Sequence, residues 1–171
     1  VVNDILYCCK DESLQTVKIP NSIRKICSYA FYGLSSLRQV TIPMGVVEIG
    51  QSAFGLCEGL QEINFPNSIV EIGKFAFNGC TSLVKVKLPK NIQKINERTF
   101  DGCTSLQTVY IPDKVVKIEE CAFDGCASLK SVQINHNVQI DNWAFPDKTT
   151  ICAPEKKIWK ILMLNQSFQE L

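Results

Sequence analysis

Hydrophobic and polar positions alternate in short segments along the chain, and each segment ends at a proline. In one of them, Ile63 and Phe65 face one way while Glu62 and Asn64 face the other. A period of two is typical of a strand that is buried on one side only. Pro66 then ends the strand, because proline has no N–H to donate to a neighbouring strand.

The residues after the proline follow a different spacing. Apolar residues come three apart at Ile69 and Ile72, and Ala76, Phe77 and Cys80 then follow at nearly helical spacing beside turn-forming residues. Each unit is therefore predicted to contain a strand, a bend, a short return segment that is helical or irregular, and a turn.

The same unit recurs every 23 residues. The repeat is visible in the prolines Pro20, Pro43, Pro66, Pro89 and Pro112, and in the phenylalanines Phe31, Phe54, Phe77, Phe100 and Phe123. A single unit cannot bury its own apolar edge, so the units must stack with each strand beside the next. The pattern predicts an α/β solenoid with one parallel, concave sheet, short helical or irregular convex segments and a continuous inner column of phenylalanines.

The two ends of the chain depart from the repeat. Residues 1–13 are expected to form a truncated or degenerate unit, with more repeats before it, and about five to six repeats then extend to residue 152. In the last unit Asn135 replaces the proline and one residue is missing before Phe145. A final strand is expected within 149–154. Residues 153–171 are predicted to be a C-terminal capping segment and the end of the protein, with a helix over 154–164.

The repeated motif resembles a known family. Its residues are clearest in Ile111-Pro112, Ala122-Phe123, Gly125-Cys126 and Ser128-Leu129. They are similar to the BspA-like (Treponema pallidum type) leucine-rich repeats over roughly residues 14–145. The resemblance implies a leucine-rich-repeat array of the kind found on surfaces of bacteria and protozoan parasites. Members with a proposed role are adhesins that bind host or bacterial surface proteins, and the family has no shared catalytic residues.

The outward residues of the strands form two columns on the predicted concave face. One column is Thr16, Gln39, Glu62, Lys85, Thr108 and Ser131, and the other is Lys18, Thr41, Asn64, Lys87, Tyr110 and Gln133. These positions vary between units, and the concave sheet is the usual binding surface of a solenoid. Tyr110 beside Lys85 and Lys87 is the strongest candidate, because Tyr supplies contact area at a low cost in entropy. The predicted protein-binding residues are Glu62, Asn64, Lys85, Lys87, Thr108 and Tyr110.

Composition narrows the function classes. The chain has 18 Lys and Arg residues and 17 Asp and Glu residues, a net charge of +1, which argues against a dedicated nucleic-acid binder and a polybasic membrane anchor. No apolar run is long enough to span a membrane, and no signal peptide is visible at residue 1. A hydrophobic content of 46% is sufficient for a core.

Four of the nine cysteines also follow the repeat, as Cys57, Cys80, Cys103 and Cys126. Leu34 holds the first place in this column, so the site accepts an apolar group and a column of buried thiols is predicted. Disulfides between neighbours and a metal site are the alternatives, but the spacing suits neither of them. Cys8 falls 23 residues before Phe31 and is expected to be partly buried, and an intermolecular bond through Cys8 or Cys9 is a further alternative.

No catalytic constellation is found in the sequence. His136 is the only histidine and lies between two asparagines in a predicted turn. Glu48 and Glu71 align one repeat apart, which indicates a solvated surface column. We therefore predict a protein that is not an enzyme and needs no cofactor or metal. Asn165 begins the one glycosylation sequon.

Two functions are compatible with these features. The first is a cell-surface or secreted adhesion module that binds a protein ligand, such as a host or extracellular-matrix protein, through its concave sheet. The alternative is a cytoplasmic leucine-rich-repeat scaffold or the regulatory arm of a larger protein, and an upstream catalytic domain is a third reading. Self-association at the N-terminal edge is also expected, because an open strand edge can pair with another chain.

Overall fold

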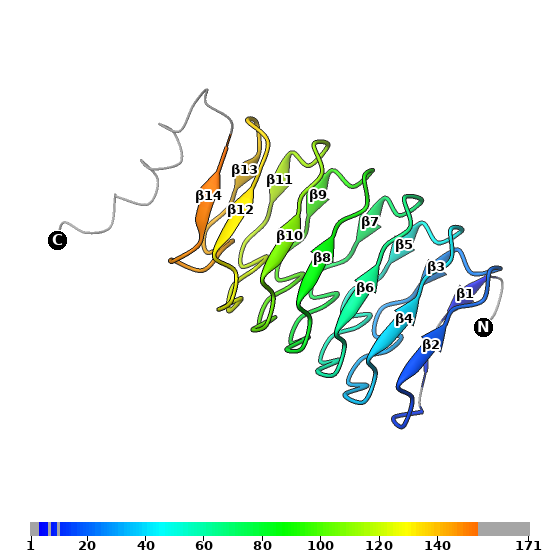
Figure 1. Ribbon diagram of the computed structural model, residues 1–171. Helices are drawn as coiled ribbons and strands as arrows, with labels where there is room; N and C mark the ends of the chain where they lie inside the picture. Colours follow the sequence, from blue (N-terminus) through cyan, green and yellow to red (C-terminus); the bar gives the residue numbers. More distant parts are fainter. Residues whose placement is uncertain (1–3, 7, 10, 154–171) are drawn as a thin grey trace.

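The structure is a computed structural model that describes residues 4–6, 8–9 and 11–153. The chain winds through successive turns that stack side by side, and each turn contributes a three-residue strand to one face (Figure 1). These strands are β2 (Thr16–Lys18), β4 (Gln39–Thr41), β6 (Glu62–Asn64), β8 (Lys85–Lys87), β10 (Thr108–Tyr110), β12 (Ser131–Gln133) and β14 (Thr150–Cys152). They are the half-buried strands that the alternating pattern predicted.

The three-residue strands form one seven-stranded sheet in the order β14-β12-β10-β8-β6-β4-β2. All its pairs are parallel, and equivalent residues of neighbouring repeats lie opposite each other, as Ile63 lies opposite Val86. The middle residue of each strand points into the core, and both of its neighbours point outward. The parallel sheet and its repeat register are thus confirmed.

The return segments also contain strands, which the sequence did not predict. Each has two residues: β1 (Ile5–Leu6), β3 (Lys25–Ile26), β5 (Glu48–Ile49), β7 (Glu71–Ile72), β9 (Lys94–Ile95), β11 (Lys117–Ile118) and β13 (Gln139–Ile140). They pair in parallel as β1-β3-β5-β7 and as β13-β11-β9. We call these two sheets together the short-strand face, and Figure 1 shows it behind the seven-stranded sheet.

The prediction of helical convex segments is wrong for the described residues, which contain strands and turns but no helix. The reason lies in the backbone hydrogen bonds between repeats. The N–H of Phe77 donates to the carbonyl of Thr99 in the next repeat (2.8 Å), and Phe100 donates in the same way to Ala122 (2.8 Å). Donors that a helix would use within itself are thus taken by the neighbouring turn of the solenoid.

The phenylalanine column is the centre of the core. Phe31, Phe54, Phe77, Phe100 and Phe123 are each at most 1% exposed. Neighbouring rings stack with centroids 4.9–5.4 Å apart and planes within 8° of parallel, and Phe145 continues the stack from Phe123 at 5.1 Å. The predicted inner column is confirmed and extends through the last unit.

The cysteine column is also buried, and its thiols are free, as predicted. Each Sγ donates to the carbonyl of a phenylalanine in the preceding repeat, from Cys57 to Phe31 at 3.0 Å and from Cys80 to Phe54 at 3.2 Å. Burial raises the pKa of the Cys57 thiol to about 12 and raises the pKa values of Cys80 and Cys103 as well. These thiols therefore act as hydrogen-bonded core residues and stay protonated at neutral pH.

The expectation for Cys8 is wrong. Cys8 is exposed, while Cys9 is half-buried and packs against the core. The N–H of Cys9 donates to the carbonyl of Ala30 (2.7 Å), just as Phe31 donates to Ala53 (2.7 Å). Cys9 therefore holds the place of the phenylalanine, because the first unit is one residue shorter there than the regular repeat.

The C-terminal unit agrees with the sequence as far as it is described. Gln139 lies opposite Lys117, which is 22 residues earlier and confirms the missing residue. The predicted final strand is β14, which pairs with β12. The predicted capping helix over 154–164 lies outside the described residues, and so does the sequon at Asn165.

One turn position has a left-handed backbone in every repeat. Gly33, Gly79, Gly102 and Gly125 hold it with φ between 67° and 76°, and Leu56 holds the same place with φ 57°. This region of φ favours glycine, since an L side chain there costs about 1–2 kcal/mol. Leu56 therefore bears a local strain that the other four repeats avoid.

Alanine substitutions at two of these glycines should separate backbone strain from crowding. A Cβ at Gly33 would meet nothing within 4 Å, so Gly33→Ala should lower the free energy of unfolding by about 1 kcal/mol through φ alone. A Cβ at Gly125 would lie 3.2 Å from the backbone of Gly102, so Gly125→Ala should cost more. Urea denaturation of both variants measures the difference, and equal losses would contradict the role of inter-repeat crowding.

Candidate protein-binding face

The six predicted binding residues form a regular grid on the seven-stranded sheet. They come from the adjacent strands β6, β8 and β10. In one row Lys85 lies between Glu62 and Thr108, and in the other Lys87 lies between Asn64 and Tyr110. The parallel register places these residues together because each repeat has the same length between equivalent positions.

The side chains of this grid point away from the core. All six are exposed except Thr108, which is half-buried. Tyr110 is 51% exposed, although it is a large aromatic residue. The Lys85 ammonium lies over the Tyr110 ring, 5.1 Å from its centroid, across the diagonal between the two strands. This contact orients Lys85 and Tyr110 relative to each other.

A further residue, which the sequence prediction left out of the site, adjoins the grid. Gln39 on β4 donates from Nε2 to Oε1 of Glu62 (3.2 Å). The bond fixes the only acidic side chain on the outward face of the seven three-residue strands. Gln39 belongs to the same outward column as Glu62, so the 23-residue period was the signal that pointed to it.

The short-strand face has a different character. Its outward residues form ion pairs between repeats, among them Lys25 with Glu48 (2.6 Å) and Lys117 with Asp141 (3.0 Å). Glu48 is half-buried and Glu71 is exposed, so the prediction of a solvated surface column holds for Glu71 and in part for Glu48. Exposed pairs of this kind contribute little to stability, but they neutralise the lysines of this face.

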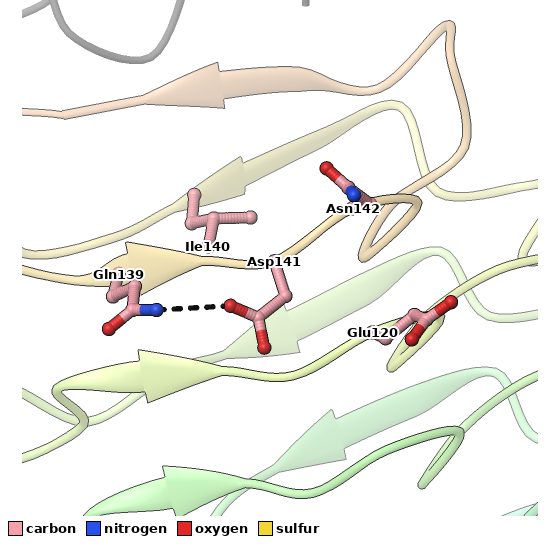
Figure 2. Close-up of a pocket in the computed structure, with 5 residues that line it drawn as sticks. All are labelled: Glu120, Gln139, Ile140, Asp141 and Asn142. Atoms are coloured by element: carbon pink, nitrogen blue, oxygen red, sulfur yellow. Dashed lines mark hydrogen bonds between the residues drawn. The ribbon is translucent and has the colours of Figure 1, made fainter. Parts of the chain in front are cut away.

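An open depression lies at the C-terminal end of the short-strand face (Figure 2). It is lined by Glu120, Gln139, Ile140, Asp141 and Asn142. Asp141 accepts a hydrogen bond from Gln139 Nε2 (3.1 Å), as Figure 2 shows, and Glu120 lies apart from this pair. The Asp141 carboxylate is thus bound by its own neighbours and faces open solvent.

The chemical groups of interest in the sequence are not brought together. His136 is exposed in a turn, and its N–H donates to the side chain of Asn135 (2.8 Å). Among residues 4–6, 8–9 and 11–153, no group of three or more His, Cys, Asp or Glu residues is placed to hold a metal ion. The same residues contain no helix that is long and apolar enough to cross a membrane.

A stack of 23-residue turns with a parallel strand in each, a buried phenylalanine column and a polar, exposed sheet defines a leucine-rich-repeat solenoid. The family described as BspA type leucine rich repeat region, with six copies, matches residues 6–130 and 49–153. The chain belongs to this family, which confirms the resemblance noted in the sequence. Repeat arrays of this fold are typical scaffolds for protein interaction.

Solved structures of bacterial proteins share the fold. A leucine rich cell surface protein from Faecalibacterium prausnitzii A2-165 is 37% identical, with a TM-score of 0.76 over 82% of this chain and 39% of that one. The T. pallidum leucine rich repeat protein is 27% identical, with a TM-score of 0.75 over 96% and 88%. The pneumococcal vaccine antigen PcpA (23% identical, TM-score 0.77, 92% and 43%) supports the fold alone.

The chain thus spans 39% of the Faecalibacterium protein and most of the T. pallidum protein. The comparison with curated proteins found no match.

Proposed function

We propose that this chain is a non-catalytic adhesion module that binds a protein ligand through the outward face of its seven-stranded sheet. The module acts at the cell surface or in a secreted protein, where a host or extracellular-matrix protein is the ligand. The observation that carries the proposal is the exposed grid on β6, β8 and β10, with Tyr110 at 51% exposure among polar side chains. An exposed aromatic residue among polar neighbours is typical of a binding hot spot.

The similar Faecalibacterium protein supports the location, because it is described as a leucine rich cell surface protein. The proposed module needs no cofactor or metal. Residues 153–171 are proposed to cap the array. Self-association is proposed at the edge strand β2, which pairs with β4 on one side only in the described sheet.

Charge reversal on the grid should abolish ligand capture. A variant with Lys85→Glu, Lys87→Glu and Tyr110→Ala removes the aromatic contact and opposes the original charge. Affinity capture from extracellular-matrix and cytosolic extracts should give extracellular partners with the original chain. Binding should weaken by about 100-fold or more in the variant, since hot-spot truncation alone costs at least about 2 kcal/mol.

A matched variant on the short-strand face, Lys94→Glu with Lys117→Glu, tests whether the effect belongs to the grid. It changes the same number of lysines but should leave capture intact. Partners retained equally by the grid variant would contradict the proposal and direct attention to the turns. Circular dichroism of both variants checks that the fold is preserved.

A cytoplasmic scaffold or regulatory arm of a larger protein is the second candidate. Its favouring observation is that all nine cysteines are free, as is usual in a reducing compartment. Capture of cytosolic partners alone, lost in the grid variant, would select this function over adhesion.

A further inference from the structure

We infer that the ligand of the seven-stranded sheet presents an acidic protein segment whose carboxylates pair with Lys85 and Lys87. The inference rests on the proposed function, because it names the chemistry of the partner at the same face. It comes from a difference in how the chain treats its lysines on its two faces, although the net charge of the whole chain is only +1.

The lysines of the short-strand face are neutralised by the chain itself. Each lies at ion-pair distance from a carboxylate on a neighbouring repeat: Lys25 from Glu48 (2.6 Å), Lys94 from Glu119 (3.3 Å) and Lys117 from Asp141 (3.0 Å). These carboxylates belong to the next repeat along the solenoid. The 23-residue period thus supplies an acidic neighbour for each outward lysine on this face.

The lysines of the seven-stranded sheet receive no such partner. In the next repeat Thr108 and Tyr110 hold the places opposite Lys85 and Lys87. Among the residues that the structure describes, no carboxylate forms an ion pair with either lysine. Both lysines are exposed, and the ring of Tyr110 supports the Lys85 ammonium at 5.1 Å. Their charge is therefore available to a partner.

The outward face of the sheet is also biased towards positive charge. The three-residue strands present Lys18, Lys85 and Lys87 but only one acidic residue, Glu62. Glu62 is already held by Gln39 (3.2 Å). A carboxylate of the ligand that approaches β8 from the side of β10 meets two lysines and the neutral Thr108 and Tyr110.

The spacing of the two lysines favours a peptide segment. Lys85 and Lys87 are two residues apart on one strand, which places their Cα atoms about 6.5–7 Å apart. Alternate residues of an extended segment have the same spacing, so an acidic-x-acidic sequence matches both ammonium groups. Glu62 on one side and neutral residues on β10 and β12 limit the patch to two lysines. A nucleic acid or sulfated polysaccharide gains affinity from many such contacts along its length, which this patch does not offer.

A labelled peptide that alternates Glu and Ser is the probe for this chemistry. The full chain should bind it at low salt in fluorescence anisotropy, and binding should weaken as salt is added. Lys85→Gln with Lys87→Gln should weaken binding by about tenfold, through the loss of two ion pairs. The matched pair Lys94→Gln with Lys117→Gln, whose lysines are already paired, should change it by less than about twofold. A peptide of Gln and Ser should not bind.

Two results would overturn the inference. One is equal peptide binding by the two lysine variants, or no peptide binding at all. The other is tighter binding of a heparin fragment or an oligonucleotide than of the peptide, lost with Lys85 and Lys87, which would assign the patch to a polyanion. If Tyr110→Ala still abolishes capture from extracts, the face binds protein and only the acidic chemistry is wrong. If capture survives the grid variant, the proposed function fails whatever the peptide does.

Discussion

Replacing Phe77 with alanine is expected to lower the free energy of unfolding by about 3–5 kcal/mol. The side chain is fully buried, and its ring stacks between Phe54 (centroids 5.2 Å apart) and Phe100 (5.4 Å). Phe65 also packs edge-on against it at 5.5 Å. Truncation would leave a cavity in the middle of the column, and a solenoid core has no second layer of residues to fill it.

Urea denaturation followed by circular dichroism measures this loss. Tyr110→Ala is the matched control, because it removes an aromatic side chain that is half-exposed on the sheet and should cost less than about 1 kcal/mol. A loss below about 1 kcal/mol for Phe77→Ala would mean that the phenylalanine column does not carry the core.

Alkaline pH is expected to destabilise the protein through its buried thiols. The pKa of the Cys57 thiol is raised from 9.0 to about 12 by burial. Between these two values the unfolded chain loses this proton and the folded chain keeps it, so the free energy of unfolding falls as pH rises. The loss from Cys57 alone is about 1.4 kcal/mol for each pH unit in this range, and burial shifts the pKa values of Cys80 and Cys103 in the same direction.

The variant Cys57→Ala isolates this contribution. Leu34 holds the equivalent place in the first repeat, so the column accepts an apolar side chain. Unfolding at about pH 8 and about pH 11 should show a loss for the original chain that exceeds the loss for the variant by about 3 kcal/mol. Identical pH dependence in the two proteins would contradict the account, because lysine and tyrosine ionisation is common to both.

The variant also tests the hydrogen bond of the thiol. At neutral pH Cys57→Ala removes the donor to the Phe31 carbonyl (3.0 Å) together with a small buried group. A loss of about 1–2 kcal/mol is therefore expected there. The pH-dependent part is read from the change in this loss, and the neutral-pH loss itself serves as the baseline.

The sequence by itself determined the repeat, its length and the orientation of its strands. Alternation at Ile63 and Phe65 assigned the inward and outward sides, and the fixed step between repeats assigned the register of Glu62, Lys85 and Thr108. These features follow from local spacing, which the stacking of identical units then copies. The buried phenylalanines and cysteines were found for the same reason, because each is one place in a column.

Only the tertiary structure decided what the return segments become and how the lysines are partnered. The spacing of Ala76 and Phe77 suits a helical turn, but the N–H of Phe77 bonds to Thr99 in the next repeat, a competition that one unit cannot reveal. In the first unit the shortened repeat put Cys9 in the place expected for Cys8. The ion pairs of the short-strand face and the unpaired Lys85 and Lys87 likewise depend on distances between repeats, since charge neutralisation is decided by neighbours in space.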